Sequence, residues 1–293
     1  MRRLSAALTF TLVLFFSAIA QEKSDREKAN LLGPVRSVRS ETIEYKDETL
    51  KQRVGIGESG SVTYDERGNE TERNTSLTQG SFASKEVRTY DAAGKLIGSV
   101  SSTDDGVDER RVYAYENGKL VRVSSYDADG KLDSKQFNSY GQDGRLVEEK
   151  YVVGKSAFGK TVFKYDQSGN LSEMAFYTPD GKKSLAVMGP CHGTHRVTYT
   201  YNAERKPTRI AHSDPDGEVK WSWQYSYDSK GMITTEILQY LSARQTFVYV
   251  YEYDSRGNWI RKITTIDYGL KNNPPPIAPR STASVTSREI TYH

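Results

Sequence analysis

The stretch Tyr165-Asp166-Gln167-Ser168-Gly169-Asn170-Leu171 decides the fold of this chain. An aspartate at the first position of a turn accepts a hydrogen bond from the backbone two residues on, and a glycine at the fourth position supplies the left-handed conformation that ends a type I turn with a bulge. Tyr165 is then the last residue of an incoming strand, and Leu171 lies at the start of the outgoing one. The stretch therefore predicts a β-hairpin.

The same pattern recurs along the chain. Close copies begin at Tyr64, Tyr90, Tyr126, Tyr227 and Tyr253, and looser copies at Tyr115, Tyr140, Tyr177 and Ser213. The glycines that we expect to be structural turn residues are Gly68, Gly94, Gly130, Gly169, Gly231 and Gly257. Replacing one of them by alanine should cost about 1 kcal/mol, because a Cβ is disfavoured at positive φ. One copy carries Arg205 where the glycine is expected, which predicts a different turn there.

The segments between turns have the alternation of β-strands. Trp221, Trp223 and Tyr225 share one face, whereas Ser222 and Gln224 share the other. Including weaker turn signals, turns recur about every 11 to 14 residues, which predicts an all-β chain of roughly 17 to 19 strands in sequential antiparallel hairpins. So many strands cannot form one flat sheet, because twist accumulates. We therefore expect a long, twisted and coiled, solenoid-like sheet with its aromatic face turned inward.

The repeat resembles that of the RHS or YD-repeat family, whose unit reads roughly Tyr-Asp-x-x-Gly-Arg/Asn-Leu followed by a Pro-Asp-Gly turn. Residues 165–181 fit it best, since Leu171 is followed by Pro179-Asp180-Gly181, and the resemblance covers about 64–266. In large members of that family the sheet spirals into a shell around a toxin and ends in a self-cleavage region. The self-cleavage signature and a toxin domain are not found here, so the resemblance implies a short, stand-alone repeat protein without the toxin-delivery role.

The two ends differ from the repeats. A basic start, an apolar run from Leu8 to Phe16 and the small-x-small site Ala18-Ile19-Ala20 predict a signal peptide over 1–20. We expect an exported chain, periplasmic or extracellular, in a bacterial host, with no transmembrane span in its mature form. Residues 21–33 are charged and are predicted to be disordered. The β domain is expected over 34–293, with a Pro-rich loop at 271–279 and a final strand at 284–292.

Composition excludes several classes of protein. Lys and Arg total 41 against 38 Asp and Glu, a net charge of +3, which provides no electrostatic footprint for nucleic acid. Cys191 is the only cysteine, so no internal disulfide can form and stability must come from packing and backbone pairing. We expect a monomer that needs no cofactor.

One short segment gathers residues suited to metal binding or nucleophilic chemistry. Cys191, His192 and His195 lie in an insertion between repeats and provide three ligands of the types that zinc or copper prefers. Their spacing matches no standard closed site, which favours an irregular loop over a metal or thiol site. No catalytic residues are predicted elsewhere.

The aromatic rows are the second candidate site. Trp221, Trp223, Tyr225, Tyr249 and Tyr251 either form a stacking platform for sugars or make up the interior layer of the sheet, depending on their exposure. The sequence thus predicts a non-catalytic scaffold or binding surface for an envelope protein or a glycan. The alternative is an enzyme that acts on an envelope or extracellular polymer, with its chemistry in residues 191–195.

Overall fold

The computed structural model describes residues 23–77, 82–186, 193–240, 243–270 and 281–293. It contains one short helix and an 18-stranded sheet. The elements are α1 (Asp25–Lys28), β1 (Val35–Tyr45), β2 (Arg53–Tyr64), β3 (Glu70–Leu77), β4 (Phe82–Tyr90), β5 (Leu96–Thr103), β6 (Gly106–Glu116), β7 (Lys119–Tyr126), β8 (Leu132–Tyr140), β9 (Leu146–Val153), β10 (Ser156–Tyr165), β11 (Leu171–Tyr177), β12 (Arg196–Tyr201), β13 (Pro207–Ser213), β14 (Val219–Tyr227), β15 (Ile233–Tyr240), β16 (Ala243–Tyr253), β17 (Trp259–Leu270) and β18 (Ser281–Tyr292).

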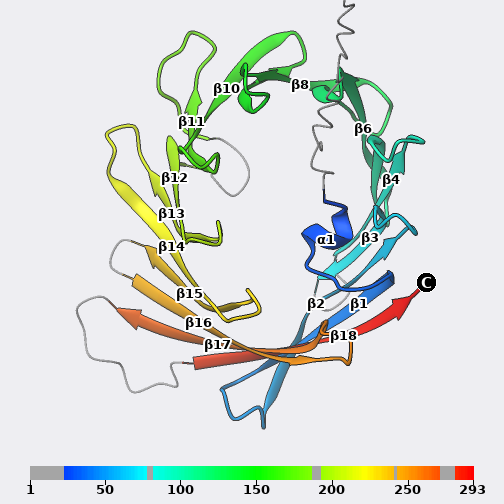
Figure 1. Cartoon of the computed structure of the whole chain (residues 1–293), viewed down its shortest axis with the longest axis vertical. Coiled ribbons are helices and arrows are strands. Elements are labelled where there is room, and N and C mark those ends of the chain that lie inside the picture. Colours follow the sequence, from blue (N-terminus) through cyan, green and yellow to red (C-terminus); the bar gives the residue numbers. More distant parts are fainter. Residues whose placement is uncertain (1–22, 78–81, 187–192, 241–242, 271–280) are drawn as a thin grey trace, which may run out of the picture.

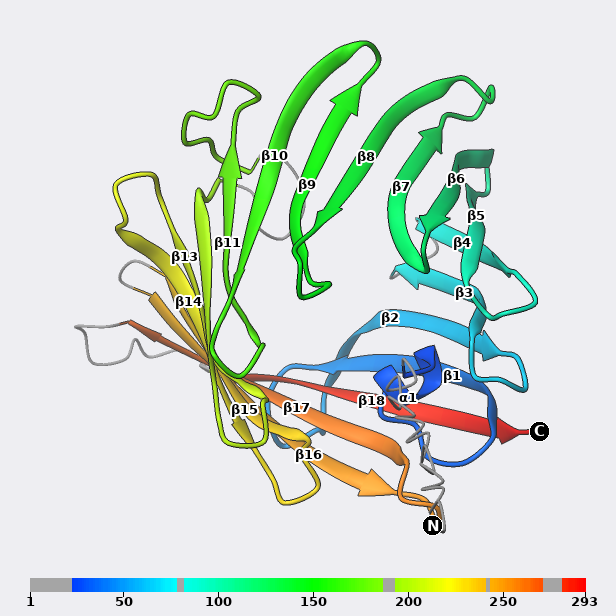
Figure 2. The ribbon, with the colours of Figure 1, turned by 45° about the horizontal axis from the view of Figure 1, so that its top comes forward.

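The sheet closes on itself. Each strand pairs antiparallel with the next, and β1 also pairs with β18, with Val38 opposite Ile290 and Ile43 opposite Val285. Figures 1 and 2 show the resulting ring of strands. The all-β, sequential antiparallel architecture is confirmed, but the sheet is a closed ring and not the long, coiled, solenoid-like sheet that we expected. Closure pairs the two strand edges that an open sheet would leave exposed.

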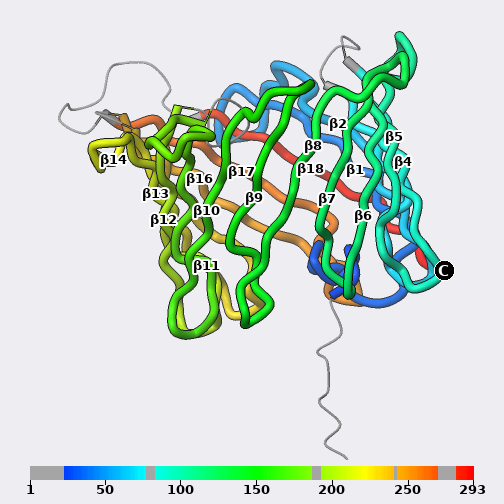
Figure 3. The backbone as a smooth tube through the Cα atoms, turned by 90° about the horizontal axis from the view of Figure 1, so that it is seen from above, coloured from blue at the N-terminus to red at the C-terminus, as the bar shows by residue number. Residues whose placement is uncertain are grey.

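Successive hairpin turns alternate between the two ends of the strands, as Figure 3 shows from the side of the ring. We call one end the tyrosine rim; its turns are 65–69, 91–95, 117–118, 141–145, 166–170, 202–206, 228–232 and 254–258. The other end, which we call the opposite rim, includes turns 104–105, 127–131, 154–155 and 214–218. The Tyr126 copy of the repeat thus lies at the other end of the strands from the Tyr165 copy, although the two sequences read alike.

The turns have the hydrogen bonds that the motif predicts. In the Tyr165 repeat, the Gly169 amide donates to the Asp166 carbonyl at 3.0 Å, and the Asn170 amide donates to the Asp166 carboxylate at 2.9 Å. Gly169 has φ +84°, and the other glycines expected at turns also lie in the left-handed region. Arg205 adopts φ +60° and donates its amide to Asn202 in the same way, so this turn is not the different one that we expected.

Residues 23–33 contain a short helix and pack against the sheet, whereas we expected disorder over 21–33; residues 21 and 22 lie outside the described residues. Ser24 and Glu27 form a reciprocal capping box on α1. The Arg26 amide donates to the Gly68 carbonyl at 2.9 Å, and the Leu32 amide donates to Asn258 Oδ1 at 2.7 Å. We call residues 23–33 the clasp, because they join the first and last turns of the tyrosine rim.

The clasp also organises the main hydrophobic cluster. Leu31 and Val35 are buried together with Val38 and Tyr64, and the partly buried Ile290 packs against them. Figure 1 shows α1 inside the ring, so these side chains define the inner face of the sheet. Composition alone suggested disorder because the partners of the clasp lie far away in the sequence.

The remaining expectations about the chain ends fall at or beyond the limits of the described residues. The signal peptide at 1–20 and the Pro-rich loop at 271–279 lie outside them. The final strand begins at Ser281, slightly before the predicted 284. No helix in the described part of the chain is long and apolar enough to cross a membrane.

Candidate functional site

The tyrosines that precede the tyrosine-rim turns are held by their hydroxyl groups. Tyr165 Oη donates to the Leu146 carbonyl at 2.8 Å, and Leu146 begins the strand that leaves the previous turn on this rim. The same bond recurs from Tyr90 to Glu70, Tyr115 to Leu96, Tyr140 to Leu120, Tyr201 to Leu171 and Tyr227 to Pro207. In the last repeat it is made to Ile233 by Tyr251, which lies two residues before the turn tyrosine Tyr253. Each bond ties one repeat to the repeat before it.

Cationic side chains add a second tie between neighbouring turns. The Arg145 guanidinium lies 5.3 Å from the centre of the Tyr165 ring and also covers Gly169, where a Cβ would sit 3.1 Å from its Nη2. Lys119 and Lys206 make the same stacking contact with Tyr140 and Tyr227. The tyrosine rim is therefore an internal structural device, and the candidate site lies elsewhere.

The inner face can be followed from the clasp to the predicted aromatic rows. Arg288 and Thr286 alternate with Ile290 along β18 and so share its inner face. Thr286 pairs with Lys262 of β17, and Lys262 pairs with Tyr251 of β16. The Tyr251 row thus points into the ring, as the sequence predicted for the aromatic face.

The inner faces of β14, β15 and β16 bring four of the five predicted binding residues together. Trp223 and Tyr225 are nearly parallel, with centroids 6.4 Å apart at 22°. Trp223 also lies 5.7 Å from Phe247, and the rings of Tyr249 and Tyr251 are 6.4 Å apart. These side chains are partly buried, so they are neither a sealed core nor a fully exposed platform.

Trp221 belongs to a different contact. Its ring stacks on His212 at 3.3 Å and 12°. His212 is only 4% exposed, and burial lowers its pKa to about 4. Since its partner ring covers this histidine, Trp221 stabilises the β13–β14 pairing instead of extending the aromatic surface.

Charged side chains flank the aromatic surface. Glu236 stands in register between Tyr225 and Phe247, and burial raises the pKa of its carboxyl group. Lys262 lies 5.4 Å from the Tyr249 ring; burial, followed by the nearby Arg288, lowers its pKa. We call Trp223, Tyr225, Phe247, Tyr249, Tyr251, Glu236 and Lys262 the aromatic site.

Sequence reasoning missed Glu236 and Lys262. Each is a charged residue on the inward side of its strand, in register with an aromatic neighbour. A charged residue at a position where the alternation predicts an apolar or aromatic one is the signal that could have identified them.

The proposed metal loop is only partly described. His195 is buried, its Nδ1 lies 3.1 Å from the Ser184 carbonyl oxygen, and its ring makes an edge contact with Tyr177 at 5.4 Å. Cys191 and His192 lie outside the described residues. Among the described residues, no group of three or more His, Cys, Asp or Glu side chains is arranged to hold a metal ion.

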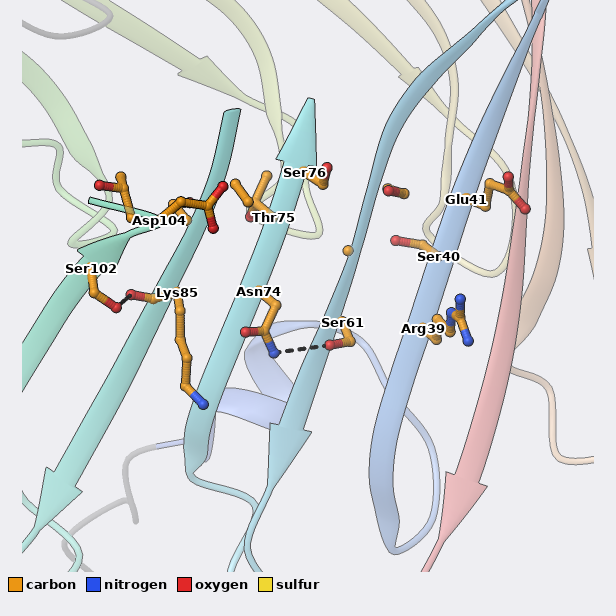
Figure 4. Close-up of a pocket in the computed structure, with 15 residues that line it drawn as sticks. Arg39, Ser40, Glu41, Ser61, Asn74, Thr75, Ser76, Lys85, Ser102 and Asp104 are labelled. Carbon is orange, nitrogen blue, oxygen red and sulfur yellow. Dashed lines mark hydrogen bonds between the residues drawn. The ribbon is translucent and has the colours of Figure 1, made fainter. Parts of the chain in front are cut away.

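A cavity lies along β1 to β5. It has a volume of about 680 Å³ and is lined mainly by serine, threonine and asparagine, with charged side chains from Arg39, Glu41, Lys85 and Asp104. Figure 4 shows Asn74 pointing toward Ser61, to which it donates a hydrogen bond of 3.2 Å. No aromatic side chain lines this cavity, so it offers hydrogen bonds but no stacking surface.

The closed sheet, the repeated tyrosine hairpins and the inward-facing aromatic rows define a shell-forming YD-repeat protein. Residues 36–266 match the model of the Teneurin YD-shell family, and the chain belongs to this family. The resemblance to RHS and YD-repeat proteins is thus confirmed.

Similar solved structures have low sequence identity. A porin-like protein from Bacteroides uniformis ATCC 8492 is 12% identical with a TM-score of 0.43, over 89% of this chain and 98% of that one. A chain in the TcdB2-TccC3-Cdc42 structure is 11% identical with a TM-score of 0.32, over 82% of this chain but only 16% of that one. A comparison with curated proteins finds no match.

Proposed function

We propose that this chain is a non-catalytic binding shell that holds a glycan on its inner aromatic site. The observation that carries the proposal is the grouping of Trp223, Tyr225, Tyr249 and Tyr251 on one inward face, partly exposed and with neighbouring rings at 22° to 41° where Trp223 contacts Tyr225 and Phe247. Aromatic faces of this kind stack against the apolar faces of sugar rings.

The polar side chains fit the same ligand. Glu236 and Lys262 stand among the rings, where they can bond the hydroxyl groups at the edge of a stacked sugar. A folded protein partner is the less favoured ligand, because α1 already lies inside the ring that the aromatic site faces (Figure 1). A single glycan chain is thinner than a folded protein and needs less of the space inside the ring.

The predicted signal peptide supports a cellular location for this protein, and the closed sheet supports an oligomeric state. The predicted signal peptide supports export to the periplasm or the extracellular space of a bacterium. Within the described residues every strand has a neighbour on both sides, so no open strand edge is left for a second copy. This arrangement supports a monomer.

The test is glycan binding by the chain that begins at residue 21, measured by glycan array and then by calorimetry. Trp223→Ala and Tyr249→Ala should each weaken binding about tenfold, since each removes a stacking surface. Phe137→Ala, an aromatic residue on β8 that is 39% exposed and lies outside the site, is the matched control and should bind normally. The proposal fails if the aromatic variants bind every captured glycan as well as the parent does.

The enzyme alternative makes a separate claim. If residues 191–195 carried chemistry, Cys191→Ser or His192→Ala would abolish hydrolysis of an envelope polymer, as followed by release of reducing ends. A binding shell should release no product in either form, and both variants should keep the parent's affinity for the glycan.

A further inference from the structure

Two cations on the inner face have no carboxylate partner. Lys262 of β17 and Arg288 of β18 form no ion pair with any described residue, and neither makes a described side-chain hydrogen bond. Arg288 stacks on Trp259 with its guanidinium carbon 3.4 Å from the ring centroid, and Lys262 Nζ lies 5.7 Å from the same centroid. One tryptophan thus lies beside two positive charges.

Other arginines on the inner face are neutralised. Arg88 lies 3.3 Å from Glu70 and 3.0 Å from Glu86, and Arg73 lies 2.6 Å from Glu70. Among the described residues, Glu236 is the one carboxylate that acts on Lys262 or Arg288, and it influences Lys262 at a distance without forming an ion pair. The contrast shows that the fold pairs inner charges near the clasp and leaves these two unpaired.

The Arg288 guanidinium is also incompletely bonded. Its Nε atom is buried without a described hydrogen-bond partner. The same is true of Arg88 Nε, but Arg88 has two carboxylate partners, whereas Arg288 has none among the described residues. A buried donor left unpaired is unfavourable, and native structures rarely keep one without a bound group to satisfy it. The Arg288 guanidinium that carries this donor stacks on Trp259, beside the aromatic site.

We propose that Lys262 and Arg288 form an anion subsite that receives the acidic substituent of a glycan whose ring stacks on Tyr249 and Tyr251. This inference rests on the proposed function and names its ligand class, an acidic polysaccharide. Two cations on adjacent strands can share one carboxylate or sulfate, and charge-assisted bonds of this kind are about twice as strong as neutral ones. The aromatic rings at their side reduce competition from water.

Electrostatics agrees with the geometry. Burial lowers the pKa of Arg288 to about 10, and burial together with Arg288 lowers the pKa of Lys262. An anion placed between the two side chains would relieve both effects, since an opposite charge favours the charged form of each cation.

The test compares three probes by calorimetry: an oligogalacturonide, a heparin-derived oligosaccharide and a cello-oligosaccharide of equal length. The first two carry carboxylate and sulfate groups and distinguish the source of the charge, and the third is neutral. We expect at least one acidic probe to bind about tenfold or more tightly than the neutral one, with an affinity that falls as salt rises.

Variants locate the effect. Lys262→Met and Arg288→Gln should each weaken binding of the acidic probe about tenfold. Arg288→Gln should leave any neutral binding unchanged, whereas Lys262→Met should also weaken it, but by less, because Lys262 bonds sugar hydroxyl groups as well. Arg288→Lys should recover part of the affinity. Lys119→Met removes a cation stacked on Tyr140 at the rim and is the matched control. Thermal unfolding of each variant checks that the ring is intact, and Lys262→Met keeps the test valid if Arg288→Gln does not fold.

The outcomes separate the two proposals. Equal binding of neutral and acidic probes, with loss only in Trp223→Ala and Tyr249→Ala, would overturn the anion subsite and keep the glycan site. Acidic binding that persists unchanged in both Lys262→Met and Arg288→Gln would also overturn it. Binding of no probe by the parent chain would remove both proposals.

Discussion

The two rims of the ring use the same turn motif to different effect. At Gly169 on the tyrosine rim, an added Cβ would lie 3.1 Å from the Arg145 guanidinium, whereas at Gly130 on the opposite rim nothing lies within 4 Å. Both glycines have positive φ and follow a Tyr-Asp pair. At the Tyr165 repeat the turn reverses the chain and its glycine also packs against the neighbouring turn, whereas the Gly130 turn of the Tyr126 repeat only reverses the chain.

The largest expected effect tests the point where the tyrosine rim is closed by the clasp. Asn258 is 2% exposed, and its side chain bonds the Leu32 amide, the Leu32 carbonyl and the Tyr292 hydroxyl. Asn258→Ala should lower the free energy of unfolding by about 2–4 kcal/mol, because it leaves buried groups unpaired. Urea denaturation followed by tryptophan fluorescence measures it.

Asn170 is the matched control for Asn258. It has the same place in its own turn, but among the described residues its side chain bonds only Asp166. Asn170→Ala should cost about 1 kcal/mol or less. Equal losses in the two variants would show that the clasp contributes nothing to closure beyond an ordinary turn.

The second prediction compares the glycines directly. Gly169→Ala should cost about 2 kcal/mol, because the left-handed strain adds to the displacement of Arg145 from the Tyr165 ring. Gly130→Ala should cost about 1 kcal/mol from strain alone. The same denaturation experiment gives both values, and a greater loss at Gly130 would contradict the packing role of the tyrosine rim.

The third prediction concerns the tyrosine hydroxyls. Tyr165→Phe removes the bond to the Leu146 carbonyl and should cost about 1 kcal/mol. Tyr126 makes no such bond to any described residue, so Tyr126→Phe should change the free energy of unfolding by less than about 0.5 kcal/mol. Thermal denaturation of the two variants, each against the parent, distinguishes the rims if the melting temperature falls only for Tyr165→Phe.

The smallest expected effect is an increase in the free energy of unfolding. Arg205 occupies the glycine position of a tyrosine-rim turn at φ +60°. Arg205→Gly should raise the free energy of unfolding by about 0.5–1 kcal/mol, because the relief of left-handed strain exceeds the greater freedom of glycine in the unfolded chain. Glu204→Gly, one residue earlier, lacks that relief and should not stabilise the protein.

Local chemistry made the hairpins predictable, because Asp166 and Gly169 determine a turn without reference to the rest of the chain. The same local signal could not assign Tyr126 to the opposite rim, since that depends on how many strands separate it from its neighbours. The local sequence signal also could not predict that the sheet closes into a ring. The pairing of β1 with β18 joins residues such as Val38 and Ile290, and no short-range pattern encodes a contact of that range.

The candidate site was predictable in part for the same reason. Alternation placed Trp223, Tyr225, Tyr249 and Tyr251 on one face, and the register then brought them together. Trp221 follows the same alternation, yet His212 covers it from the neighbouring strand. The positions of Lys262 and Arg288 beside one tryptophan depend on the pairing of β17 with β18, which single-strand periodicity cannot show.

The bond between the His293 amide and the Pro34 carbonyl, 2.9 Å long, has a consequence for the order of assembly. A ribosome makes β1 first and β18 last, so the first strand must wait with an open edge until all others have been synthesised. Premature pairing of that edge with a neighbouring molecule is the hazard of such a design.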